Sequence, residues 1–204
     1  MSDPYSICHE CGLAGKDCCS NTPNAILVGI PEAVKIHHET RLKYSEFLVW
    51  TKLNEHQFQE AFTELLPNGK TLAFKRKADN ACIFIAPDGC RIFNLRSAVC
   101  ILFPYWYDPE VYKENGTIDL FTEENRAFGD QGCALIAKLE TFKTIDEGCR
   151  FIGTTEEEVK ALMKRALENF AMTRKYEHLF ETKKLDDAFK IIEKDLKLGK
   201  KKER

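Results

Sequence analysis

The sequence predicts an α+β fold in which cysteines pin a small core containing an antiparallel hairpin, and amphipathic helices follow toward the C-terminus. Three observations lead to this prediction. Four cysteines lie within the twelve residues 8–19. A Pro87-Asp88-Gly89 turn separates two apolar runs of the kind that form β-strands. From Thr155 onward, apolar residues recur every three or four positions, which is the spacing of an amphipathic helix.

Composition limits the classes of protein that fit. The 204 residues suffice for one domain, or for one domain with a helical appendage, and are 44% hydrophobic and 30% charged, as in globular proteins. The formal net charge of −2 gives no electrostatic reason to expect a nucleic-acid partner. No apolar run approaches the ~20 residues of a membrane span, and the N-terminus lacks the apolar segment of a secretory signal. We therefore expect a cytoplasmic protein with no membrane partner.

The first third of the chain alternates short apolar runs with turns. Residues 25–30 predict a short buried strand. Pro31 then opens a helix, since its missing N–H costs nothing at the first helical position. Apolar residues at helical spacing predict a second helix near residues 55–66, and Pro67-Asn68-Gly69 ends it with a turn.

The middle of the chain contains the predicted hairpin. After a strand over residues 72–74, the runs 83–85 and 90–93 are joined by the Pro-Asp-Gly turn. Cys82 and Cys90 fall at the starts of the two strands, and Cys100 follows in a short helical turn. Two nearby cations, Arg91 and Arg96, could lower the pKa of these thiols or neutralise a thiolate centre.

The last third is predicted to be helical. Thr155 and Glu158 form a capping box, after which one helix is expected to run to about Phe180. A second amphipathic helix covers residues 185–196 and ends at Gly199, while Gly148-Cys149 predicts a turn. The predicted domains are a cysteine-cluster domain over residues 1–150 and a helical extension packed on it over residues 151–204.

The cysteines point to metal. Nine is an odd number, and clustered cysteines in a reducing compartment are more often metal ligands or catalytic groups than disulfides. Cys8-x2-Cys11 has chelate spacing, and a thioredoxin-like redox pair would need a preceding strand that seven residues cannot supply. The adjacent thiols Cys18 and Cys19 point in different directions. They suit two separate centres, or one centre with the second thiol left for another role or buried as a small core residue.

The other cysteines and the histidines differ in how strongly they indicate a metal ligand. Three cysteines, Cys82, Cys90 and Cys100, fall within nineteen residues around a turn, which is a stronger pattern than any of them alone. Cys133 follows a glycine just as Cys149 does, and the residues alone do not separate these two. The histidines are not expected to bind the metal. His37 and His38 are expected to form a surface pair at a helix end, and His56 and His178 lie in polar helical contexts. His9 lies inside the cysteine cluster but next to a better ligand.

Several separate motifs form one pattern: Cys-x2-Cys-Gly…Cys-Cys over residues 8–19, the segments 81–85 and 89–93, Cys100 and Phe103-Pro104. This pattern resembles that of the YkgJ-type cysteine-cluster family, which is described as zinc- or iron-chelating. The similarity covers about residues 8–135. It implies the metal ligands Cys8, Cys11, Cys18, Cys19, Cys82, Cys90, Cys100 and Cys133. It gives Cys149 no counterpart.

The chain departs from the family pattern at several places. Ser97 stands where the family has proline, Ile101 where it has arginine, and Ala134 where it has the proline after Cys133. The choice between Cys133 and Cys149 as the eighth ligand therefore stays open. The cysteine pattern is also similar to that of the flagellin lysine methylases, which implies methyl transfer, although no separate motif in the chain supports that activity.

The expected function is that of a cytoplasmic metal-binding protein with an all-cysteine centre, in an electron-transfer or accessory role. An iron–sulfur cluster, 4Fe–4S, is favoured over zinc, because only one Cys-x2-Cys knuckle is present. The alternatives are an iron–sulfur-dependent oxidoreductase or protein methyltransferase, and a structural zinc domain that contacts a protein partner through its C-terminal helices. Deleting residues 182–204 should then leave metal binding intact and abolish any dimer. Whether the protein is an enzyme is undecided, since the sequence has no Gly-rich phosphate loop, no Ser/His/Asp set and no His-Glu-x-x-His.

Overall fold

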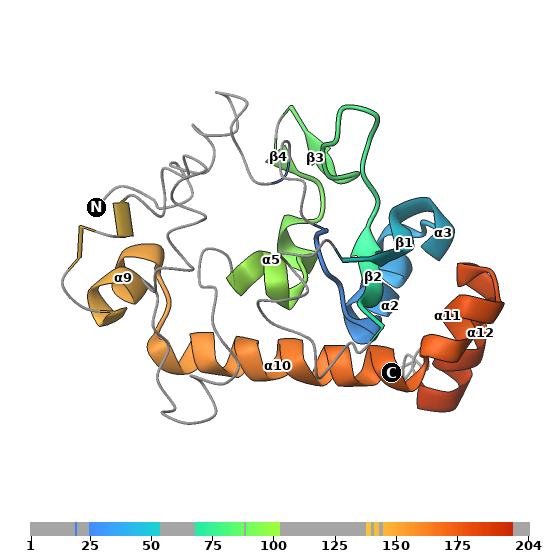
Figure 1. The fold of residues 1–204 in the computed structure, drawn as a ribbon. Helices are drawn as coiled ribbons and strands as arrows, with labels where there is room; N and C mark the ends of the chain where they lie inside the picture. Colours follow the sequence, from blue (N-terminus) through green and yellow to red (C-terminus); the bar gives the residue numbers. More distant parts are fainter. Residues whose placement is uncertain are drawn as a thin grey trace, which may run out of the picture.

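The structure is a computed structural model, and it describes residues 25–53, 68–87, 89–102 and 145–197, together with residues 19, 138–139 and 141–142. Figure 1 shows short strands beside a set of helices, which confirms the predicted α+β class. In chain order the elements are α2 (Ile30–Thr40), α3 (Tyr44–Phe47), β1 (Leu48–Lys52), β2 (Lys70–Phe74), β3 (Ile85–Ala86), β4 (Gly89–Cys90), the 3-10 helix η1 (Phe93–Leu95), α5 (Ala98–Leu102), α9 (Ile145–Ile152), α10 (Glu156–Lys175), α11 (Glu177–Thr182) and α12 (Leu185–Leu196).

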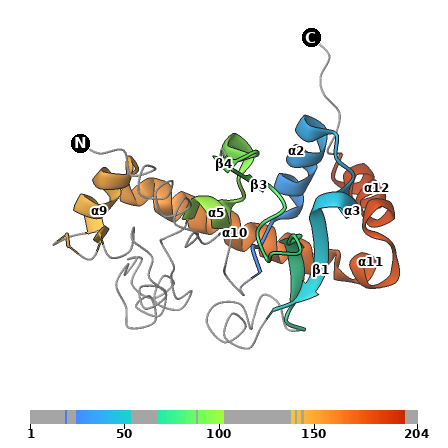
Figure 2. The same ribbon diagram turned by 90° about the horizontal axis from the view of Figure 1, so that it is seen from above.

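Helix α10 is the longest described element, and it packs against α9, α5, α2 and β2 (Figures 1 and 2). Its predicted capping box is confirmed: the Glu158 amide donates to Thr155 Oγ1 at 3.2 Å, and the Thr155 amide donates to Glu158 Oε2 at 3.0 Å. The expectation of one helix to Phe180 was wrong. Tyr176, at φ −106° and ψ 9°, ends α10, and a separate helix α11 follows.

Strands β1 and β2 form an antiparallel pair that sequence reasoning did not anticipate, with a register from Leu48↔Phe74 to Lys52↔Lys70. The predicted strand over residues 25–30 appears only as an isolated bridge between Leu27 and Ala73, beside β2. The turn before β2 is confirmed at its described residues, where Gly69 has a φ of 63°. The predicted helix near residues 55–66 lies outside the described residues, as do Phe103-Pro104 and Gly199.

The predicted hairpin is confirmed in its topology, although it is shorter than expected. Strands β3 and β4 pair as Ile85↔Cys90 and Ala86↔Gly89, and Gly89 takes a φ of 115° that other residues rarely adopt. The predicted second strand does not reach Phe93, because residues 91–92 form a turn and Phe93 begins η1. This early end directs the chain toward α5 and Cys100.

Two clusters of buried side chains organise the described part of the chain, and residues from both sides of position 150 contribute to each. We call them the first and the second cluster. The first contains Val28, Ile30, Ala33, Val34, Ile36, Tyr44, Phe47, Leu48, Leu72, Phe74, Cys82, Phe84, Ile92, Tyr176, Leu179, Phe180, Ala188, Phe189 and Ile192. The second contains Leu27, Leu53, Ala98, Leu102, Cys149, Val159, Met163, Ala166 and Phe170. The helices after residue 150 therefore share their cores with earlier elements, and the domain boundary at residue 150 stays a prediction.

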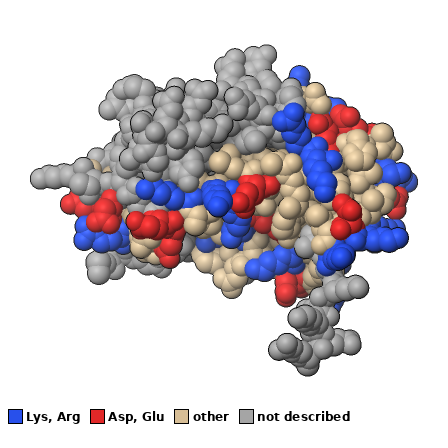
Figure 3. Space-filling model, turned by 90° about the horizontal axis from the view of Figure 1, so that it is seen from below, with Lys and Arg blue, Asp and Glu red and all other residues tan. Residues whose placement is uncertain are grey.

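Charged side chains of both signs lie side by side on the face of the molecule shown in Figure 3. Among the residues that the structure describes, no helix has the length and apolar character needed to cross a membrane.

Hydrogen bonds to a carboxylate join α3 to α12 and give a pH-dependent prediction. Burial raises the pKa of Asp186, but hydrogen bonds from the Ser45 hydroxyl (2.5 Å) and the Ser45 amide (3.2 Å) outweigh it, so the net shift is downward. A carboxyl whose pKa is lower in the folded state stabilises above its unfolded pKa, and this contribution disappears as pH falls through the folded pKa.

We therefore expect Ser45→Ala to lower the free energy of unfolding by about 1 kcal/mol at pH 7, a value reduced for partial solvent exposure. The loss should shrink below pH 4, as Asp186 becomes protonated in the variant and the parent alike. Urea unfolding of the parent and the variant at pH 7 and at pH 3 measures the loss of free energy and its change with pH. An equal loss at the two pH values would mean that the hydroxyl acts through packing and not through the carboxylate.

Candidate metal centre

Four of the eight predicted ligands lie in the described part of the chain, and all four are in or against the first cluster. Cys82 belongs to this cluster, and Cys19, Cys90 and Cys100 are partly buried against it. These residues come from separate stretches of sequence, and the fold brings them to the same core. The remaining candidates, Cys8, Cys11, Cys18 and Cys133, lie outside the described residues.

Backbone hydrogen bonds tie three of these cysteines to one another. The Cys82 amide donates to the Cys19 carbonyl at 2.6 Å, and the Ile85 amide donates to the Cys82 carbonyl at 3.0 Å. Ile85 in turn pairs with Cys90 across the hairpin. Cys19, at the end of the N-terminal cysteine cluster, is therefore attached to Cys82, which lies in an isolated bridge before β3. The prediction that Cys82 and Cys90 begin the two strands was wrong, because Cys82 precedes β3 and Cys90 ends β4.

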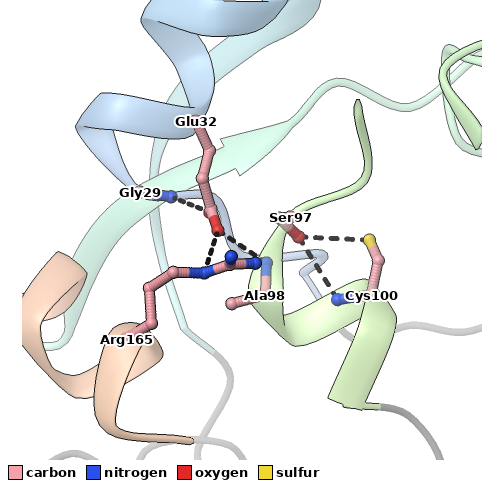
Figure 4. Close-up of polar contacts among 6 residues, drawn as sticks. All are labelled: Gly29, Glu32, Ser97, Ala98, Cys100 and Arg165. Carbon is pink, nitrogen blue, oxygen red and sulfur yellow. Dashed lines mark hydrogen bonds and ion pairs between the residues drawn. The ribbon is translucent and has the colours of Figure 1, made fainter. Parts of the chain in front are cut away.

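Cys100 is positioned by the start of α5. The Ser97 hydroxyl precedes this helix and accepts a hydrogen bond from the Cys100 amide at 3.3 Å, as a helix-capping serine does. The same hydroxyl donates to Cys100 Sγ at 3.2 Å (Figure 4). The sulfur is thereby held at the first turn of α5.

A carboxylate anchors this turn to the rest of the fold. Glu32, in the first turn of α2, accepts hydrogen bonds from the Ala98 amide (2.7 Å) and the Gly29 amide (3.0 Å). Arg165 of α10 pairs with it at 3.7 Å (Figure 4). Glu32 thus links α2, α5 and α10 next to Cys100. The Glu32 side chain is 13% exposed and that of Arg165 is 50% exposed, so the carboxylate is largely shielded from water while the guanidinium is not.

Burial raises the pKa of two of these thiols, Cys82 and Cys100. Burial raises the pKa of Cys100 to about 11; the Ser97 hydrogen bond opposes this, and Cys82 and Cys90 add to it. The pKa of Cys82 is also raised, first by burial, with a further contribution from Cys90. Several thiolates cannot coexist in such a site unless a cation compensates their charge, and a bound metal would supply that compensation.

The donor set therefore fits zinc or an iron–sulfur group. All four described candidates are cysteines, the ligand type common to both. Within the described ranges, no three Cys, His, Asp or Glu side chains are arranged to hold a metal ion by themselves.

The cations near the thiols differ from those that the sequence suggested. Arg76 and Lys77 lower the pKa of Cys82, and Arg76 donates to the Cys19 carbonyl at 3.2 Å. The Arg96 guanidinium lies 3.8 Å from the centre of the Phe93 ring. Sequence reasoning missed Arg76 because it precedes the hairpin, and only its bridge to Cys82 places it there.

Cys149 lies apart from this group. It is fully buried in the second cluster, inside helix α9, so the predicted turn at Gly148-Cys149 was wrong. Its neighbours there include Val159 and Met163 of α10. This setting is typical of a cysteine that packs as a small apolar residue.

Histidines 37 and 38 are engaged elsewhere. The His37 ring stacks on Tyr44 at 4.4 Å, and His38 Nε2 lies 3.4 Å from a carboxylate oxygen of Glu193. Both are half-buried, so the expected solvent-facing pair was only partly right. These contacts connect α2 to α3 and α12.

Sequence reasoning also missed the roles of Ser97 and Glu32. Ser97 is a departure from the proline of the family pattern, but a serine three residues before Cys100 is also a helix-capping signal. Glu32 follows Pro31 in the first helical turn, where a carboxylate often caps the helix. Its contact with the start of α5 depends on tertiary packing, which the local sequence does not show.

Comparison with known proteins identifies the family of the chain. The family model "CxxCxxCC: Putative zinc- or iron-chelating domain" matches residues 7–159, which include all the predicted ligands. The match confirms the resemblance seen in the sequence and supports metal binding. No curated protein and no solved structure matches the chain.

Proposed function

The chain belongs to the CxxCxxCC family, and from this premise we propose that it carries an iron–sulfur cluster, 4Fe–4S, in a cytoplasmic electron-transfer or accessory role. The proposed ligands are Cys8, Cys11, Cys18, Cys19, Cys82, Cys90, Cys100 and Cys133. The observation that supports this most is the gathering of Cys82, Cys90 and Cys100, which come from a bridge, a strand and a helix, in and against the first cluster.

The distribution of the thiols favours a cluster over a single zinc ion. Structural zinc sites usually take ligands in Cys-x2–4-Cys pairs, whereas Cys82, Cys90 and Cys100 come singly from three local structures. Iron–sulfur clusters are larger and accept cysteines from dispersed positions. A bound cluster would supply one-electron transfer. The protein would orient the thiolates, and the buried apolar side chains of the first cluster would exclude water from the metal.

Anaerobic purification followed by metal and sulfide analysis tests the proposal. We expect brown protein that absorbs broadly near ~400 nm and contains iron and acid-labile sulfide. Colourless protein with stoichiometric zinc and no sulfide, obtained from iron-supplied cells, would contradict the iron–sulfur assignment. That result would favour the structural zinc domain instead.

Two single substitutions test the ligand set. Cys90→Ser should lose most of the bound metal, because it removes a thiolate at the hairpin. Cys149→Ala should keep the parent's metal content, because Cys149 is buried in the second cluster. Both are checked by metal-to-protein ratio in folded, anaerobically purified protein. Equal metal loss in the two variants would place Cys149 among the ligands and would contradict our assignment of Cys133.

A further inference from the structure

The Ser97 hydroxyl makes two contacts with the same residue, and each uses a different part of the group. It is fully buried. Its lone pair accepts from the Cys100 amide at 3.3 Å, and its single proton is directed to Cys100 Sγ at 3.2 Å. A hydroxyl has one donor and two acceptor positions, so both contacts exist together. Capping α5 needs only the acceptor, so the contact to sulfur is an additional feature.

The position of this hydroxyl is fixed from outside its own segment. The next residue, Ala98, donates its amide to Glu32 Oε1 at 2.7 Å. Glu32 is itself held by the Gly29 amide at 3.0 Å and by Arg165 at 3.7 Å (Figure 4). Because Ala98 is tied to α2 and, through Arg165, to α10, the turn that presents Ser97 to Cys100 cannot shift freely.

We propose that the Ser97 hydroxyl donates a hydrogen bond to the metal-bound Cys100 thiolate and sets how strongly that sulfur donates to the metal, with Glu32 as the positioning residue. This inference rests on the proposed function. A hydrogen bond to a ligating sulfur withdraws electron density from it, which raises the reduction potential of an iron–sulfur centre. It also moves sulfur-to-metal charge-transfer absorption to shorter wavelength, because the sulfur orbitals are stabilised.

The test compares Ser97→Ala with Ser97→Thr, which keeps the hydroxyl. For metal-loaded protein, Ser97→Ala should keep its metal content, move the charge-transfer band to longer wavelength and lower the reduction potential. Ser97→Thr should have nearly the same band position and reduction potential as the parent. If the bound metal is zinc, the band is read after exchange with Co²⁺.

The role of Glu32 is tested against a matched control. Glu46 caps α3 as Glu32 caps α2, by accepting from the Lys43 amide, but it is exposed and, unlike Glu32, accepts no hydrogen bond from the described residues at the start of α5. Glu32→Ala should shift the charge-transfer band in the same direction as Ser97→Ala. Glu46→Ala should remove a helix cap and leave the band unchanged, so loss of stability alone cannot produce the shift.

The outcomes separate the two levels of the proposal. Parent protein that binds no metal would overturn the proposed function. Metal-loaded parent with the same band and potential in Ser97→Ala would overturn the present inference alone. Loss of metal in Ser97→Ala and Ser97→Thr alike would also overturn it, because packing and not the hydroxyl proton would then be the requirement.

Discussion

Replacing Gly29 by alanine is expected to lower the free energy of unfolding by about 3 kcal/mol and the melting temperature by about 10 °C. Gly29 is buried between the start of α2 and helix α10. An added Cβ would lie 2.4 Å from Cγ and 2.5 Å from Cβ of Asn169, well inside van der Waals contact. Asn169 is 6% exposed and sits within α10, so it cannot turn aside without moving the helix. Thermal melting followed by circular dichroism measures the effect.

Two further variants show whether the clash is the cause. Gly153→Ala is the control: nothing lies within 4 Å of an added Cβ there, so only the positive φ of 76° opposes the change, at about 1–2 kcal/mol. The double variant Gly29→Ala/Asn169→Gly should be more stable than Gly29→Ala alone, although glycine within a helix normally destabilises by about 1 kcal/mol. A double variant that is less stable than either single one would contradict the close approach of α2 and α10.

Removing α12 by ending the chain after residue 184 is expected to abolish cooperative folding of the first cluster. Ala188, Phe189 and Ile192 are fully buried in it, and Phe189 stacks on Tyr44 at 3.8 Å. The truncation would also remove Glu193, which accepts a hydrogen bond from the Tyr44 hydroxyl at 2.6 Å. Near-UV circular dichroism should lose its signal, because aromatic side chains would no longer be held rigidly.

This changes the expectation drawn from sequence, in which deleting residues 182–204 would leave metal binding intact. Phe189→Ala gives a graded version: loss of about 4 kcal/mol is expected from the cavity that it leaves. Ile191→Ala on the same helix should change stability by less than about 0.5 kcal/mol, because Ile191 is 43% exposed. Similar losses in the two variants would contradict the observed orientation of α12. A protein partner, if α12 binds one, would use the exposed side that carries Ile191; this remains a proposal.

Local chemistry accounts for what the sequence predicted well. The Thr155 capping box, Pro31 at the start of α2 and the Pro-Asp-Gly turn act within a few residues, so their signals are complete in the sequence. The cysteine pattern identified the family because each of its motifs can be read directly in the sequence, although the motifs are spread over a long stretch. The break at Tyr176 and the helical setting of Cys149 depend on packing against distant elements. The links from Glu32 to Ala98 and Arg165 likewise join residues far apart in sequence, which no single stretch reveals.

The contacts between α3 and α12 have a consequence for the timing of folding. Tyr44 and Glu193 are separated by 149 positions, and Ser45 and Asp186 by 141. Non-local contacts of this kind form slowly, because a long loop must close first. During synthesis, the chain up to Cys133 is made before α12 exists to cover Tyr44. If the proposed ligands bind metal, we expect uptake to begin before the first cluster is complete.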